Sequence, residues 1–167
     1  MDLLLTNKRA AVAASSGGLG FAIARALGAE GCRVGICGRD GFRIERAAAS
    51  LRDGAGAEII PAVVDVSEPG ATSAWLDGLA AHWGGLDLVV ANAGGPPPGR
   101  FGETRPKDWD AAYRLTLRSA LELAAAARPY LGAGSGVLFM TGPVVRQPVG
   151  TLGLSGIMRS GEGALAR

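Results

Sequence analysis

A cluster of small residues near the amino terminus has the composition of a phosphate-binding turn. The apolar run of residues 10–14 gives way to serines and glycines, and a helical pattern begins at once. Glycine lets the backbone approach a pyrophosphate closely, and the N–H groups and positive dipole end of the following helix offset the phosphate charge. The cluster therefore predicts a strand–turn–helix site for a dinucleotide. Its members are Ala14, Ser15, Ser16, Gly17, Gly18, Leu19 and Gly20.

Short apolar runs alternate along the chain with longer alanine- and leucine-rich stretches of helical spacing. This alternation predicts an α/β fold, a three-layer doubly wound parallel sheet of Rossmann-like type with helices on both faces. Pro61 lies in the third apolar run and lacks a ladder N–H, so it belongs on an edge strand, which fits the order 3-2-1-4-5. The expected strands are 9–14, 33–37, 58–64, 86–91 and 136–140, and the expected helices are 18–30, 41–52, 69–83, 106–131 and 152–166.

Composition narrows the classes of partner. Of 167 residues, 48% are hydrophobic, 19% are charged and 27 are glycine, which is typical of one compact domain with many turns. The formal charge is only +2, with lysine and arginine scattered, so no nucleic-acid partner is expected. No apolar run reaches the roughly 18 residues of a membrane span, and residues 1–6 lack the basic start of a signal peptide. We therefore expect a cytoplasmic protein without a membrane partner.

The two cysteines do not form a predicted disulfide or metal site. Cys32 and Cys37 are five residues apart around one expected strand, where odd spacing directs them to opposite faces. Buried free thiols are the better interpretation. Cysteine and histidine are too few and too badly spaced for a metal centre, so no metal is expected.

Two further motifs follow expected strands. Asp65 and Val66 come after the third strand, and an Ala-Asn-Ala-Gly sequence ends the fourth. Together with the glycine turn, where Ala14 stands in place of a first glycine, these motifs resemble those of the short-chain dehydrogenase/reductases, in particular the 3-oxoacyl-carrier-protein reductase-like members. The resemblance runs over the whole chain, and each motif lies at the strand edge where open α/β sheets bind ligands. It adds Asp65, Val66, Asn92, Ala93 and Gly94 to the expected cofactor site.

The end of the second expected strand bears on cofactor choice. A carboxylate there would bind the ribose 2′-hydroxyl of NAD, whereas this chain has Arg39, whose guanidinium can pair with a 2′-phosphate. The sequence therefore predicts NADP(H) as the preferred cofactor, with NAD(H) as the alternative. A competing interpretation is that Arg39 is merely solvated and Asp40 caps the next helix.

The catalytic half of the family pattern is substituted. The resemblance implies a tyrosine acid, a lysine four residues later, a serine and an asparagine, and alignment puts other residue types at these positions. A serine hydroxyl is a poor general acid, and arginine cannot relay a proton because it stays charged. Threonine and serine could still bind a substrate, and the arginine could still hold ribose hydroxyls or a carboxylate. The four aligned positions are Ser155 for tyrosine, Arg159 for lysine, Thr141 for serine and Thr116 for asparagine.

Family domains continue beyond the helix at 152–166 with further strands and a substrate-covering loop, so we expect one domain over 1–167 that is incomplete at its carboxyl end. It is either part of a longer protein or a natural short form that depends on a partner. Two function classes stay open. One is an NADP-dependent oxidoreductase acting on a small carbonyl or secondary alcohol, and the other is a dinucleotide-binding or assembly module without hydride chemistry. A homodimer or homotetramer is expected through the helices at 106–131 and 152–166, which are apolar on more than one face and which pair in family members.

Overall fold

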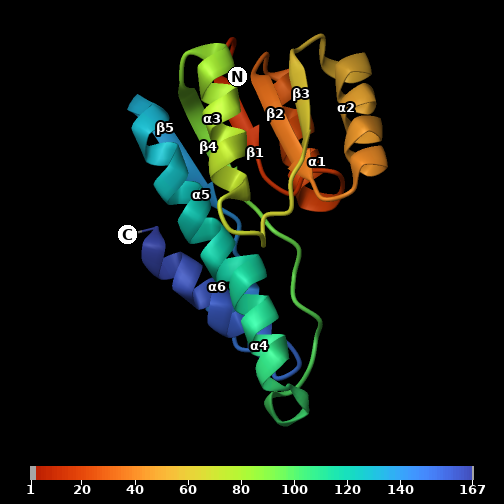
Figure 1. Ribbon diagram of the computed structural model, residues 1–167, viewed down its shortest axis with the longest axis vertical. Coiled ribbons are helices and arrows are strands. Elements are labelled where there is room, and N and C mark those ends of the chain that lie inside the picture. The colour runs from red at the N-terminus through yellow and green to blue at the C-terminus, as the bar shows by residue number, and fades with distance from the viewer. Residues whose placement is uncertain (1–2, 167) are drawn as a thin grey trace.

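The computed structural model describes residues 3–166 and contains one parallel sheet with strand order β3-β2-β1-β4-β5 (Figure 1). The expectation that residues 1–6 are no targeting segment falls partly on Met1 and Asp2, which lie outside the described residues. The predicted fold class and strand order are confirmed. The strands are β1 (Arg9–Val12), β2 (Arg33–Gly38), β3 (Ile59–Val63), β4 (Leu86–Ala91) and β5 (Leu131–Phe139).

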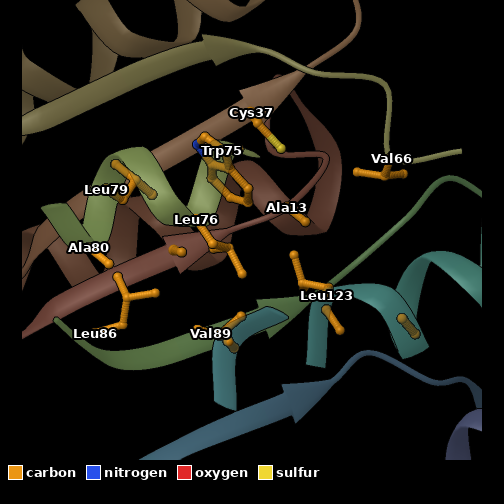
Figure 2. Close-up of a cluster of buried hydrophobic side chains, with 14 of the residues drawn as sticks. Ala13, Cys37, Val66, Trp75, Leu76, Leu79, Ala80, Leu86, Val89 and Leu123 are labelled. Atoms are coloured by element: carbon orange, nitrogen blue, oxygen red, sulfur yellow. The ribbon is translucent and has the colours of Figure 1, made fainter. Parts of the chain in front are cut away.

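Helices cover the two faces of the sheet. On one face α3 and α5 pack on the strands, and Figure 2 shows Leu76 and Leu79 of α3, Val89 of β4 and Leu123 of α5 meeting there. On the other face α1 and α2 bury a second apolar cluster. The helices are α1 (Gly18–Ala29), α2 (Gly41–Ala55), α3 (Ala71–Trp83), α4 (Pro106–Ala112), α5 (Ser119–Ala127) and α6 (Gly153–Leu165). Among the described residues, no helix is both long and apolar enough to cross a membrane.

The cysteines occupy the two faces as expected. Cys37 lies in the cluster under α3 and α5, whereas Cys32 lies in the cluster under α1 and α2, and both are buried free thiols. Pro61 is likewise where its missing N–H predicts, because β3 pairs with β2 on one side and is an edge strand on the other.

The expected helix over 106–131 is wrong in detail. The chain forms α4, then a π-helical segment (Tyr113–Arg118), then α5 and a 3₁₀ turn (Arg128–Tyr130), and β5 already begins at Leu131. The first half of β5 is rich in glycine, a residue that carries no strand pattern and packs no side chain, so its extended form was invisible in the sequence. Pro129 fits the first turn of the 3₁₀ segment, where no N–H is needed.

The carboxyl ends of all strands meet at one edge of the sheet, and α4 and α6 extend beyond that edge (Figure 1). These two helices and the π-helical segment bury a small cluster of their own, around Ala112, Leu154 and Met158. At the opposite edge, Arg9 of β1 and Asp87 of β4 form a two-pronged ion pair, with Nε–Oδ2 at 2.7 Å and Nη2–Oδ1 at 3.2 Å. The candidate site lies at the carboxyl edge of the sheet, beside this helical extension, and the ion pair holds the opposite edge together.

Candidate dinucleotide-binding site

A cleft of about 270 Å³ opens at the carboxyl edge of the sheet. Its walls come from the β1–α1 turn, the end of β2, the segment after β3 and the loop after β4, which are the places where the sequence motifs lie. The fold thus brings together seven of the predicted cofactor residues. The lining residues are Ala14, Ser16, Gly17, Gly38, Arg39, Arg43, Val64, Asp65, Val66, Gly94, Gly95 and Leu115.

The helix α1 begins at this cleft with its backbone donors free for a ligand. Its N-cap is Gly17, no side chain caps it within the described part of the chain, and its first turn carries no acidic residue. The first N–H groups of a helix have no partner inside the helix, and the dipole there is positive. Gly18 adopts φ +58°, a left-handed conformation that favours glycine, although it does not line the cleft.

Ala14 departs from good backbone geometry. It has φ +47°, in the left-handed region, at the position where the family pattern has glycine. An alanine side chain there costs about 1–2 kcal/mol, because its Cβ crowds the following carbonyl. The turn therefore keeps its shape in spite of this residue, which indicates that its other contacts hold it.

Ser15 and Asn92 supply such contacts and do not line the cleft. The Ser15 hydroxyl is fully buried, donates to the Val12 carbonyl at 2.7 Å and accepts from the Cys37 N–H at 3.2 Å. The Asn92 amide donates to the carbonyls of Ala13 and Ala14 at 3.1 and 3.2 Å. Both side chains hydrogen-bond to the backbone near the ends of neighbouring strands, so they fix the backbone that forms the cleft without lining it.

The remaining predicted residues of the turn and the fourth-strand motif also lie outside the cleft lining. Leu19 is exposed, and Ala93 packs against the α3 and α5 side of the sheet. Gly20 faces β1 so closely that an added Cβ would lie 2.6 Å from the Ala14 carbonyl oxygen. A side chain at this position would clash with the backbone of the β1–α1 turn, so close packing within the protein by itself requires glycine here.

Two arginines give the cleft its positive charge. Arg39 follows β2 as predicted, and Arg43 stands beside it in the first turn of α2. The sequence argument missed Arg43, although Asp40 offered a clue: its carboxylate caps the helix by accepting the Arg43 N–H at 2.9 Å. The competing interpretation of Asp40 as a helix cap is therefore correct, and it places a second guanidinium at the same cleft.

Asp65 is the acidic residue that lines the cleft. The Ser67 hydroxyl and backbone N–H, which donate to its carboxylate at 2.7 and 2.9 Å, lower the pKa of Asp65 below its ordinary value, and the charge of Arg39 lowers the pKa further. The group is thus held ionised, and its hydrogen bonds form a tight turn after β3. An anchored carboxylate of this kind can accept hydrogen bonds from a neutral ring amine.

The four positions aligned with the family's catalytic residues lie apart from the cleft lining. Thr116 is fully buried in the π-helical segment, Thr141 is exposed after β5, and Ser155 is half-buried near the start of α6. Arg159 reaches the end of β5, where its guanidinium donates to the Met140 carbonyl and lies 3.5 Å from Glu162. Their roles in catalysis stay predictions.

The sequence analysis did not single out Glu162 as a buried or functional residue. Its side chain is 3% exposed, and burial raises its pKa to about 7 even though the charge of Arg159 opposes this rise. Nothing in the sequence marks this glutamate of α6 as buried. Among the described residues, no group of three or more histidine, cysteine or acidic side chains could hold a metal ion.

The family pattern described as Enoyl-(Acyl carrier protein) reductase matches residues 13–165, which include the whole cleft. Curated relatives include the 3-oxoacyl-[acyl-carrier-protein] reductase of Chlamydia trachomatis, 31% identical over 87% of this chain and 59% of its own length. The chain is a member of the short-chain dehydrogenase/reductase family. A further curated relative of the chain is tropinone reductase-like 3 of Erythroxylum coca, which is 30% identical over 92% of this chain.

Solved structures support the same family. L-Sorbose reductase from Gluconobacter frateurii, complexed with NADPH and L-sorbose, superposes with a TM-score of 0.91 at 26% identity and covers 96% of this chain. A short-chain dehydrogenase from Burkholderia cenocepacia in complex with NADP gives a TM-score of 0.90 at 28% identity. The chain spans 62% of the first structure and 59% of the Chlamydia relative, so the described fold is about three fifths of the length of these proteins.

Proposed function

We propose that this short-chain dehydrogenase/reductase binds NADP(H) in the cleft at the carboxyl edge of its sheet. The observation that carries the proposal is the presence of Arg39 and Arg43 on the same cleft as the free amino end of α1. The helix end and glycine turn suit a pyrophosphate, whereas two guanidiniums suit a further phosphate. The solved relatives in complex with NADPH and NADP support this choice of dinucleotide.

Charge explains the expected preference over NAD(H). Asp65, the acidic group of the cleft, accepts hydrogen bonds within its own turn, and Arg39 follows β2, where a carboxylate would be needed to bind a ribose 2′-hydroxyl. A guanidinium forms paired, charge-assisted hydrogen bonds to phosphate but only weaker ones to a hydroxyl. NAD(H) should therefore bind, and NADP(H) should bind more tightly.

Isothermal titration with NADP and with NAD tests this proposal. The variant Arg39→Asp should weaken NADP binding far more than NAD binding, because it removes an attraction for the phosphate and adds a repulsion. Arg25→Asp is the matched control: Arg25 is exposed on α1, outside the cleft lining, and the change carries the same charge difference. Equal weakening of both cofactors by Arg39→Asp, or an equal effect of the control, would contradict the proposal.

We further propose that the function of the whole protein is hydride transfer between this cofactor and a small carbonyl or secondary alcohol, with slow turnover. General acid catalysis supplies roughly 10²- to 10⁴-fold in rate, and a serine at position 155 cannot supply it as a phenol does. Turnover of a panel of ketones with NADPH should therefore be very low. The double variant Ser155→Tyr with Arg159→Lys should raise it, and brisk turnover by the unaltered protein would refute this account.

One observation favours a second candidate, a dinucleotide-binding module without hydride chemistry. The guanidinium of Arg159 already donates to the Met140 carbonyl and lies 3.5 Å from the Glu162 carboxyl, so it is engaged by groups of the protein itself. Stoichiometric NADP binding with no turnover in either the unaltered protein or the double variant would decide for this candidate.

We also propose a homodimer or homotetramer in the cytoplasm. Exposed apolar side chains on α5, on the loop before α6 and on α6, namely Leu121, Val149 and Ile157, support an interface between copies. Two buried free thiols fit a reducing compartment. Light scattering tests the assembly, and a monomeric mass would exclude it.

A further inference from the structure

Three buried polar side chains surround a small cavity beside the dinucleotide cleft. Glu162 comes from α6, Thr116 from the π-helical segment and Thr72 from the first turn of α3, and all three line a cavity of about 10 Å³. Their exposed fractions are 3%, 0% and 1%. Val66 lines both this cavity and the cleft, so the two adjoin.

The two threonine hydroxyls lack partners. Neither Thr72 Oγ1 nor Thr116 Oγ1 has a hydrogen-bond partner among the described residues. A buried hydroxyl without a partner is costly, and most buried polar groups bond to protein or to ordered water. A cavity of about 10–15 Å³ accommodates one water, which needs two to four polar partners. Two hydroxyls and one carboxyl meet that requirement.

The Glu162 carboxyl is the one group at this cavity that titrates near neutrality. The groups that face it are Thr72 from α3, Thr116 and Ser119 from the π-helical segment and α5, Asn92 from the loop after β4, and Arg159 from its own helix. The Ser119 hydroxyl already donates to the carbonyls of Leu115 and Thr116. Within the described lining, Glu162 is therefore the only charged residue, and Arg159 is its only ionic partner.

We propose that Glu162, Thr72 and Thr116 bind one internal water and form a proton-binding site whose ionisation decides how firmly Glu162 holds Arg159 at the end of β5. When the carboxyl carries its proton, Arg159 keeps only the Met140 carbonyl as a strong partner. When the proton leaves through the water to solvent, the carboxylate forms a charge pair with the guanidinium. Glu162 is thus a positioning residue for Arg159, and this inference does not depend on the proposed cofactor.

The effect of burial on the pKa of Glu162 also supports a proton-binding site that holds a water. Desolvation raises the pKa of Glu162 to about 7, so the carboxyl changes charge within the ordinary working range of a protein. A bound water would solvate the carboxylate and limit that rise. Removing the hydroxyls that hold the water should therefore raise the pKa of Glu162 further, which separates a hydrated site from a dry one.

Nuclear magnetic resonance of the protein labelled with ¹³C in its glutamate carboxyls is the direct test, with Glu162→Gln used to assign the signal. We expect a titration midpoint near 7 for Glu162. Thr116→Val should shift this midpoint upward, Thr116→Ser should restore it, and the exposed control Thr6→Val should leave it unchanged. A midpoint in the ordinary range of glutamate, or no shift in Thr116→Val, would overturn the proposal.

The same samples report on Arg159. Its Nε–H signal should move with pH at the midpoint of Glu162, and this movement should vanish in Glu162→Gln. If Thr116→Val fails to fold, Thr72→Val provides the same comparison from α3. An Arg159 signal that does not follow the Glu162 titration would refute the positioning role, even if the carboxyl itself titrates near 7.

Discussion

Gly20 and Asn92 touch at the carboxyl edge of the sheet, so closely that a Cβ at position 20 would lie 2.7 Å from the Asn92 amide nitrogen. That nitrogen is already engaged by the carbonyls of Ala13 and Ala14. The helix α1 can therefore approach β1 and β4 only because position 20 has no side chain. The contact determines where the free end of α1 points.

Gly20→Ala should destabilise the protein by about 2 kcal/mol, in the range of overpacking substitutions, because the added methyl meets backbone and a fixed amide. Urea unfolding measures the change. Gly78→Ala is the matched control: this glycine lies in α3 with open space around it, so alanine should stabilise by about 0.5–1 kcal/mol. Equal effects of the two variants would show that the contact at Gly20 relaxes without cost.

Ala14→Gly should stabilise the turn. Alanine at φ +47° costs about 1–2 kcal/mol, whereas glycine adds about 0.4–1 kcal/mol of unfolded-state entropy, so we expect a net gain of at most about 1.6 kcal/mol. Thermal unfolding checks the sign. Ala29→Gly, at the end of α1 in ordinary helical geometry, should instead lose stability. A loss in Ala14→Gly would mean that the left-handed conformation is not strained.

Arg43→Ala should weaken NADP binding by about tenfold, which corresponds to about 1.4 kcal/mol, and should leave NAD binding nearly unchanged. The reason is that Arg43 lines the cleft together with Arg39, the residue proposed to bind the 2′-phosphate that NAD lacks. Titration calorimetry with both dinucleotides measures the ratio, and Arg25→Ala controls for the loss of one positive charge. If Arg43→Ala weakens both cofactors alike, the side chain contacts the part that they share.

Glu162 should make the protein less stable as pH rises. Its folded pKa of about 7 exceeds its ordinary value of 4.5, so the folded state binds the proton more tightly than the unfolded state does. This contribution is fully present below pH 4.5 and is lost as pH rises to about 7, on the order of 3 kcal/mol in all. Glu162→Gln should flatten that slope in urea unfolding series.

The exposed Glu45 on α2 is the matched control, because Glu45→Gln changes the same functional group without burial. It should leave the slope between pH 4.5 and 7 as it is in the unaltered protein. A slope that survives in Glu162→Gln would assign the effect to another group.

The sequence predicted the strand order and the sheet edge at which the cleft opens because both depend on short-range patterns. Apolar runs, the glycine turn and the position of Pro61 each report on their own backbone. Arg43 and Glu162 were missed for a different reason: their roles depend on what tertiary packing brings next to them. Arg43 joins the cleft through the cap at Asp40, and Glu162 is buried beside residues of α3, β4, the π-helical segment and α5.

Predictions about Ser15 and Asn92 show an intermediate case. Both were predicted to belong to the cofactor site, yet their side chains bond to backbone groups at the ends of strands. A sequence motif identifies which positions belong to a site. It does not tell whether the residue at a given position contacts the ligand or holds the backbone in place. Only the direction of the side chain separates the two roles.

The free side of β5 has a consequence for handling the protein. Among the described residues, β5 pairs only with β4, and its first half alternates glycine with small or exposed residues. Such a strand has open N–H and C=O groups and few side chains to fix its register. At high concentration, a polypeptide limited to residues 1–167 should add copies along this edge in more than one alignment, forming open-ended, cross-β-like aggregates rather than a closed assembly. An outward lysine on β5 should suppress this growth.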